Sequence, residues 1–130
     1  MLSLIIPTKE LDDYLFDTVC KYKFSIKCDY EIIIVYDINN ESQFNKFAKY
    51  FNKDSIIKLY YNPDKGRINA LNLGFTHSSG NIIKCIDADD TLLDGFFDEL
   101  FMMEKYPAHC HNATLVNEKN IPIGSYTFDN

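Results

Sequence analysis

Three aspartates crowd into one short segment, Asp87-Ala88-Asp89-Asp90, directly after the mostly apolar residues 82–86, which we expect to be buried. Carboxylates this close together repel one another, and a bound divalent cation removes that cost. Hard oxygen ligands favour Mg²⁺ or Mn²⁺, and such an ion could neutralise a diphosphate and support its departure as a leaving group. The competing interpretation is that these aspartates cap the following helix and solvate a turn.

Asp37, Lys65 and Arg67 could also contact a nucleotide or another anionic ligand. Asp37 ends a very apolar run, where its carboxylate could accept from a nucleobase N–H or form an Asx-turn into the next helix. Lys65 and Arg67 are cations in an acidic chain, next to the flexible Gly66, and could meet phosphate or base oxygens. For both cations, solvated surface charge is the competing interpretation.

The elements that must position these residues are short apolar runs alternating with amphipathic stretches. The runs at residues 2–7, 31–35, 55–61 and 81–86 predict strands. Helical spacing is shown by Leu11, Tyr14, Leu15, Val19 and Tyr22, by Phe44, Phe47, Ala48 and Phe51, by Ile68, Leu71 and Phe75, and by Phe96, Phe97, Leu100 and Phe101. This alternation predicts an α/β fold with a mostly parallel sheet and right-handed crossovers.

Ligands of open parallel sheets bind beyond the carboxyl ends of the strands. The polar residues named above follow strand ends, and the first strand adds three more, Pro7, Thr8 and Glu10. We therefore expect four separate segments to converge on one crevice, and this convergence carries more weight than any single motif.

Two further stretches have their own predicted features. Small residues at Ala70, Asn72 and Gly74 allow the third helix to approach the sheet or a ligand closely. The fourth helix should end before Pro107. Residues 113–117 and 121–128 then predict two strands joined by a polar turn, a candidate β-hairpin within residues 113–130.

Composition limits the classes of protein to which the chain can belong. Its 130 residues suit a single domain, and the 46% of hydrophobic residues allow a packed core. A net charge of -6 argues against a general nucleic-acid binder, which needs a basic face. The four cysteines form no C-x-x-C pair, which favours reduced thiols and a cytoplasmic protein. No segment approaches the roughly 20 apolar residues that span a bilayer, so membrane contact would need a partner or a missing segment.

The chain resembles the family 2 glycosyltransferases, which have the GT-A (Rossmann-like) fold. Four pieces carry the resemblance over roughly residues 3–100. They are residues 3–8, residues 31–37, the spaced set Gly66, Ala70, Asn72 and Gly74, and residues 79–83 leading into the aspartate segment. The chain would then be the N-terminal, nucleotide-sugar-binding part of such an enzyme.

The resemblance implies a role for each candidate residue. Pro7, Thr8 and Glu10 correspond to the first nucleotide-contacting loop, and Asp37 to the residue that reads the base, typically uracil. Lys65 and Arg67 lie in the segment that approaches the base and phosphates. Asp87 corresponds to the ribose- or metal-side aspartate, and Asp89 to the direct metal ligand. The implied substrates are a UDP-linked sugar, bound with Mg²⁺ or Mn²⁺, and a glycan or lipid-linked acceptor.

The chain also departs from the family pattern. Tyr36 stands where the family often has a first aspartate, and residues 38–40 replace its usual Gly-Ser turn. The family domain runs on about as far again and carries the acceptor site and general base there, so no base is assigned here. We expect a sheet that is incomplete at the C-terminus, and its exposed apolar surface could favour a homo-oligomer.

Three alternatives use the same residues. Residues 86–94 also resemble the first motif of haloacid-dehalogenase-like phosphatases, with Asp87 as nucleophile and Asp89 as acid/base. That motif normally opens the fold, whereas three strand–helix units precede it here. A nucleotide-sugar-binding module without catalysis is the second alternative. A nucleotidyltransferase, which shares the general architecture, is the third.

Overall fold

The computed structural model describes residues 1–37, 40–103, 105, 108 and 113–127. The chain forms two compact units, Met1–Leu100 and Phe101–Asn130, which are described separately below. The prediction of one domain over residues 1–130 stays a prediction. No described helix has the length and apolar character that a membrane crossing requires.

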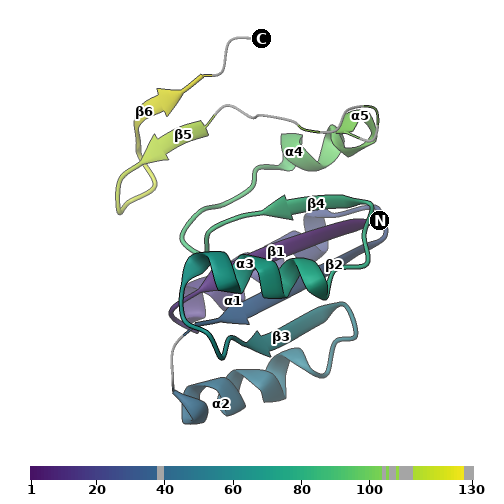
Figure 1. The fold of residues 1–130 in the computed structure, drawn as a ribbon. Helices are drawn as coiled ribbons and strands as arrows, with labels where there is room; N and C mark the ends of the chain where they lie inside the picture. The colour runs from purple at the N-terminus through teal and green to yellow at the C-terminus, as the bar shows by residue number, and fades with distance from the viewer. Residues whose placement is uncertain (38–39, 104, 106–107, 109–112, 128–130) are drawn as a thin grey trace. The chain divides into compact units, whose positions relative to one another are not determined.

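The first unit contains a four-stranded parallel sheet (Figure 1). Its strands are β1 (Leu2–Thr8), β2 (Tyr30–Tyr36), β3 (Ile57–Tyr61) and β4 (Ile82–Cys85), in the order β3-β2-β1-β4. Every residue of β1 is buried, and β2 is buried from its second residue onward. The predicted parallel α/β fold is therefore confirmed.

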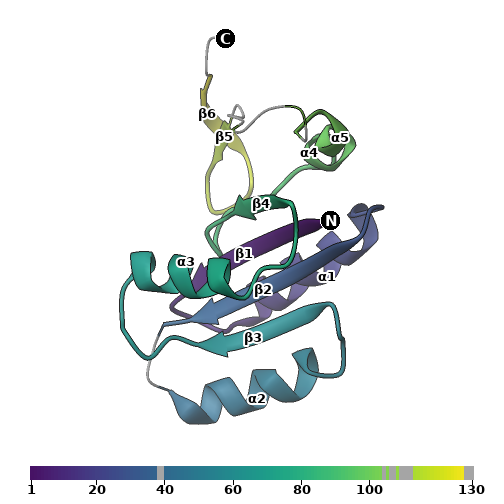
Figure 2. The ribbon, with the colours of Figure 1, turned by 45° about the vertical axis from the view of Figure 1, so that its right-hand side comes forward.

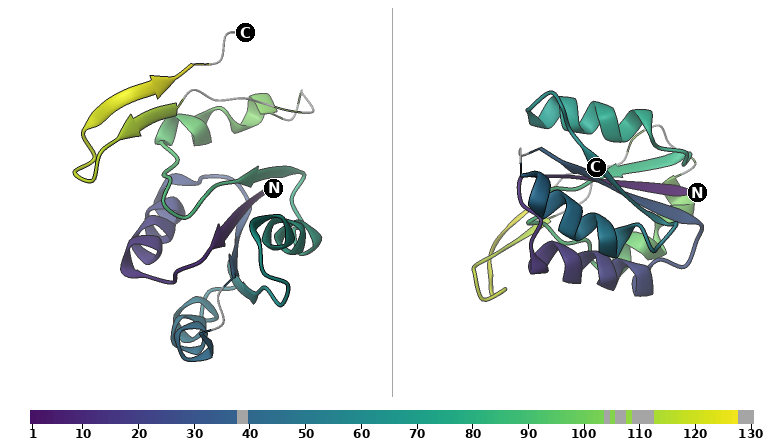
Figure 3. Two further views of the ribbon diagram at one scale, coloured as in Figure 1. Left: turned by 60° about the vertical axis from the view of Figure 1, so that its left-hand side comes forward. Right: turned by 90° about the horizontal axis from the view of Figure 1, so that it is seen from below.

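Helices cover both faces of this sheet, with α1 (Asp13–Ser25) and α2 (Glu41–Phe51) on one face and α3 (Arg67–Thr76) on the other (Figure 3). The chain runs from β1 through β2 to β3 at one edge of the sheet and then crosses to β4 on the other side of β1. Right-handed crossovers therefore place the third helix on the opposite face. Both helices on the first face begin with a side-chain N-cap. The Asp12 side chain accepts from the Leu15 amide at the start of α1, and the Asn40 side chain accepts from the Gln43 amide at the start of α2.

The small residues of α3 form its buried face. Ala70 and Gly74 are buried, whereas Ile68 and Phe75 are 68% and 63% exposed. A Cβ atom at Gly74 would lie only 2.5 Å from Cγ2 of Ile5, so the helix packs closer to β1 than any larger residue allows. The apolar residues whose spacing predicts this helix, Ile68, Leu71 and Phe75, do not form its buried face. Of these three, only Leu71 packs against the core cluster of Ile5, Ile33, Val35 and Ala70.

Two expectations about the chain after residue 80 are wrong. β4 is only partly buried, with Ile83 37% exposed, because it is an edge strand that pairs with β1 alone among the described strands. The single fourth helix is instead two short ones, α4 (Asp94–Asp98) and α5 (Leu100–Met103). The expected end before Pro107 and the thiol of Cys110 lie outside the described residues, while Cys20, Cys28 and Cys85 are free thiols.

The second unit contains an antiparallel hairpin of β5 (Ala113–Val116) and β6 (Pro122–Tyr126). The Asn117 side chain stabilises its turn by accepting from the backbone amides of Lys119 at 2.9 Å and Ile121 at 3.0 Å. Asn120 takes the left-handed conformation, with φ at 60°, that asparagine tolerates better than most residues.

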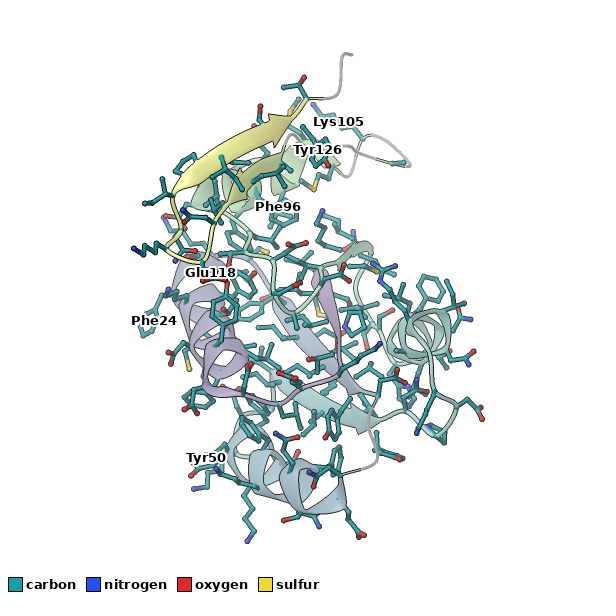
Figure 4. The ribbon with its side chains drawn as sticks, turned by 90° about the vertical axis from the view of Figure 1, so that its left-hand side faces the viewer. Phe24, Tyr50, Phe96, Lys105, Glu118 and Tyr126 are labelled. Carbon is teal, nitrogen blue, oxygen red and sulfur yellow. The ribbon has the colours of Figure 1, made fainter. Side chains whose placement is uncertain are left out.

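Exposed aromatic residues mark the outer surfaces of α1 and α2. Phe24 of α1 and Tyr50 of α2 point away from the sheet (Figure 4). Tyr50, with Lys46 and Lys49, borders a shallow hollow of about 870 Å³ along α2, which none of the predicted site residues lines.

Candidate functional site

A cleft of about 380 Å³ lies at the carboxyl ends of the parallel strands, where their arrowheads point in Figure 2. Its lining residues come from the segments after β1, β2 and β4 and from α3 and the start of α1. They are Pro7, Thr8, Lys9, Glu10, Asp12, Tyr14, Asp37, Arg67, Ala70, Asp87, Ala88 and Asp89. Of the residues to which the family resemblance gives a role, only Lys65 is absent from this lining, although its neighbour Arg67 is present; Asp90, the third aspartate of the segment, is also outside it.

Asp37 is 8% exposed and is held by the loop between β3 and α3. Its Oδ1 atom accepts from Nδ2 of Asn62 at 2.7 Å, and both of its oxygens lie 3.0 Å from the amide nitrogen of Gly66. Gly66 has φ at 121° and ψ at 147°, a region open essentially to glycine alone. Asp37 therefore ties the end of β2 to the start of α3 while still lining the cleft.

Arg67 is the first residue of α3 and forms an ion pair with Asp87 across the cleft. Its Nε and Nη2 atoms donate to Oδ1 of Asp87 at 3.1 and 2.9 Å. The two side chains are 59% and 45% exposed, so solvent screens the pair and a ligand can reach both groups. A cation therefore lies beside the aspartate segment.

The aspartate segment forms a turn in which the amide of Asp90 donates to the carbonyl oxygen of Asp87 at 3.0 Å. Loss of solvation, followed by the charges of Asp89 and Asp87, raises the pKa of the Asp90 carboxyl. Within the described ranges, no three His, Cys, Asp or Glu side chains gather in a way that could hold a metal ion by themselves.

The loop after β1 uses the Thr8 hydroxyl internally. Thr8 Oγ1 donates to the Glu10 carbonyl at 2.6 Å and accepts from the Glu10 amide at 3.2 Å. The Thr8 carbonyl accepts from the Asp37 amide at 2.9 Å, which joins this loop to the end of β2. The side chain of Thr8 is therefore occupied in shaping the loop, whereas Glu10 is exposed at the cleft.

Sequence reasoning assigned no role to two cleft residues, Tyr14 and Asp12, or to Asn62, which lies behind the cleft against Asp37. Tyr14 fits helical apolar spacing, but its ring is half-exposed at the cleft and its hydroxyl lies 3.2 Å from Oγ1 of Thr91. Asp12 lines the cleft as the N-cap of α1, and an aspartate just before an amphipathic run is a recognisable signal. Asn62 follows β3, as the other site segments follow their strands, yet its contact with Asp37 depends on loop conformation.

The chain belongs to glycosyl transferase family 2, whose model matches residues 3–116. A Rickettsia bellii (strain RML369-C) protein described as an uncharacterized glycosyltransferase is 27% identical over 89 residues, which are 68% of this chain and 13% of that protein. The predicted family is thereby confirmed, and the match favours the glycosyltransferase interpretation over the phosphatase one.

Solved structures show the same fold. The crystal structure of TarS from S. aureus superposes with a TM-score of 0.56 at 20% identity, covering 69% of this chain and 17% of TarS. The mannosyltransferase PcManGT from Pyrobaculum calidifontis, in complex with GDP-Man and Mn²⁺, gives 0.55 at 20% identity, covering 69% of this chain and 28% of that chain. This likeness confirms the predicted GT-A fold, and the chain spans under a third of each of these proteins.

Proposed function

We propose that this chain forms the donor-binding part of a glycosyltransferase that takes a sugar from a nucleoside diphosphate, most simply UDP. The acceptor in this proposal is a hydroxyl of a glycan or a lipid-linked glycan. The observation that carries the proposal is the single cleft lined by Pro7, Thr8, Glu10, Asp37, Arg67, Asp87 and Asp89 in a family 2 domain.

The cleft offers separate partners for the base and for the phosphates. Asp37 is nearly buried at one part of the lining and presents a carboxylate, which accepts only. It therefore suits a base N–H. Arg67 stands at the N-terminus of α3, where its own charge adds to the helix dipole in attracting phosphate oxygens. Lys65 is adjacent in sequence and acts in this proposal as a supporting cation outside the lining.

The donor chemistry of the aspartate segment fits Mg²⁺ or Mn²⁺. Asp87 and Asp89 supply hard carboxylate oxygens at the same cleft, and their negative charges add to the loss of solvation that raises the pKa of the neighbouring Asp90. Two carboxylates leave positions for phosphate and water oxygens, which is the usual way such ions are held at phosphate sites. When bound, the ion neutralises diphosphate charge and supports its departure as a leaving group.

Transfer also requires removal of the acceptor hydroxyl's proton as that oxygen attacks the anomeric carbon. We assign no residue of this chain to that role. Asp37, Arg67 and the aspartate segment bind and orient the donor, and the acceptor site is left to the rest of the enzyme.

Titration calorimetry with UDP and Mn²⁺ tests the proposal. Asp89→Ala should abolish the Mn²⁺-dependent part of UDP binding while leaving the melting temperature within about 2 °C of wild type, because this carboxylate is exposed and forms no hydrogen bond or ion pair with another described residue. Asp98→Ala removes an equally exposed carboxylate from α4 and should change neither quantity. Unchanged UDP affinity in Asp89→Ala would contradict the proposal. Tight binding of UDP without sugar transfer to any acceptor would favour the alternative of a nucleotide-sugar-binding module without catalysis.

A further inference from the structure

The carboxylate of Asp37 has less hydrogen-bonding capacity toward the cleft than a free carboxylate. Oδ1 already accepts from Nδ2 of Asn62 at 2.7 Å and from the Gly66 amide at 3.0 Å, which uses both of its lone pairs. Oδ2 shares the same Gly66 amide at 3.0 Å and keeps one lone pair. Counted over the residues that the structure describes, Asp37 can therefore accept one further strong hydrogen bond, on a single oxygen.

Asn62 is fixed so that this arrangement persists. Its side chain is 2% exposed, and its backbone amide donates to the carbonyl oxygen of Tyr36 at 2.8 Å. The side-chain Nδ2 also lies 3.4 Å from the Gly66 carbonyl oxygen. A carboxylate only accepts, so the amide nitrogen rather than the amide oxygen must face Asp37. Rotation of this amide would place two acceptors against each other at a buried position.

We propose that Asn62 is a positioning residue that selects the nucleobase, an inference that rests on the proposed donor site. Together with the Gly66 amide, Asn62 fills Oδ1 of Asp37 and leaves one acceptor, on Oδ2, for one N–H, which matches the imide edge of uracil. Guanine presents two adjacent N–H groups that pair with both oxygens of a free carboxylate. One of those groups would stay unpaired here, so UDP binds roughly tenfold or more tightly than GDP.

Calorimetry with UDP and GDP, each with Mn²⁺, tests the role of Asn62. Wild type should prefer UDP, and Asn62→Ala should bring the UDP-to-GDP affinity ratio toward one, because Oδ1 regains the lone pair that Asn62 occupied while the Gly66 amide keeps the other. Asn69→Ala is the matched control, since Asn69, in the first turn of α3, donates to the Lys65 carbonyl at 3.2 Å and has no hydrogen bond to Asp37. That control should leave the ratio unchanged, whereas a merely structural role of Asn62 would weaken both nucleotides equally.

The possible outcomes separate this inference from the function on which it rests. A wild-type protein that binds neither nucleotide would overturn the donor site itself. A wild-type protein that binds GDP as well as UDP, or an Asn62→Ala variant with an unchanged ratio, would overturn the role of Asn62 alone. If Asn62→Ala does not fold, the wild-type UDP-to-GDP affinity ratio still tests the single-acceptor geometry, and UDP methylated at N3 tests whether the base donates to Asp37 at all. The methylated nucleotide should bind at least about tenfold more weakly than UDP, and equal binding would refute the contact between the base and Asp37.

Discussion

Arg67 is one of two cationic residues in the lining of a cleft that is otherwise rich in carboxylates. Lys9 also lines the cleft, but Arg67 is the residue that donates twice to Asp87. The ion pair is half-exposed and should contribute at most about 1 kcal/mol to folding stability. In the proposed function its role is ligand binding, with the guanidinium already oriented at the cleft to meet a phosphate.

Replacing Arg67 by Gln should weaken UDP binding by about tenfold, because a charge-assisted contact to phosphate is lost. The melting temperature should change little. Lys49→Gln removes the same charge from the exposed surface of α2 and serves as control. Calorimetry at two salt concentrations checks the result, and equal losses in both variants would show that net charge rather than position is responsible.

At the scale of elements, two glycines let neighbouring segments approach one another. Gly74 allows α3 to lie against Ile5, and Gly80 lets the loop before β4 pass the start of β1. A Cβ atom at Gly80 would lie 2.6 Å from the Met1 carbonyl oxygen and 2.7 Å from the Ser3 amide nitrogen. Backbone atoms cannot move aside as a flexible side chain can, so this position tolerates glycine alone.

Gly80→Ala should lower the free energy of unfolding by about 1–3 kcal/mol, the usual cost of overpacking. Gly95→Ala is the matched control, because a Cβ atom there meets nothing within 4 Å and alanine favours the helical conformation of α4. Urea unfolding followed by circular dichroism measures both variants. A Gly80→Ala protein as stable as Gly95→Ala would show that the loop can shift at little cost.

At the scale of the first unit, one buried network joins the strands at the end of the sheet opposite the cleft. Glu31 of β2 accepts from the Ser3 hydroxyl at 2.6 Å, from the Ser79 amide at 2.5 Å and from Lys58 of β3 at 2.6 Å. Burial pushes the pKa of Glu31 upward, but the hydrogen bonds from Lys58, Ser3 and Ser79 together lower it below its ordinary value.

The lowered pKa of Glu31 predicts a pH dependence of stability. The ionised Glu31 should stabilise the folded protein fully above the pKa of the group in the unfolded chain, about 4.3. This stabilisation should be lost as the pH falls through the lower pKa of the folded protein. Glu31→Gln should be less stable at neutral pH and should lose less on acidification, because that group no longer titrates. Midpoints of urea unfolding, measured for both proteins from about pH 7 to pH 3, check this. If the two midpoints fall in parallel with pH, Glu31 is not the source of the pH dependence.

The positions of strands and cleft-facing segments could be predicted from sequence, because they depend on local patterns. Apolar runs predict the strands, and Asp12 and Asn40 start helices through side-chain caps only three residues from their partners. Parallel strands share one carboxyl edge, so Asp37 and Asp89 could be assigned to a common crevice before any coordinates were considered.

The tertiary structure decided which atoms of those segments remain available. Thr8 uses its hydroxyl within its own loop, Arg67 rather than Lys65 lines the cleft, and Asn62 occupies one oxygen of Asp37. The contacts of Arg67 and Asn62 join residues 20 and 25 positions apart, so they follow from how strands and helices pack rather than from local spacing. The partial exposure of β4 likewise follows from the strand order, which makes it an edge strand.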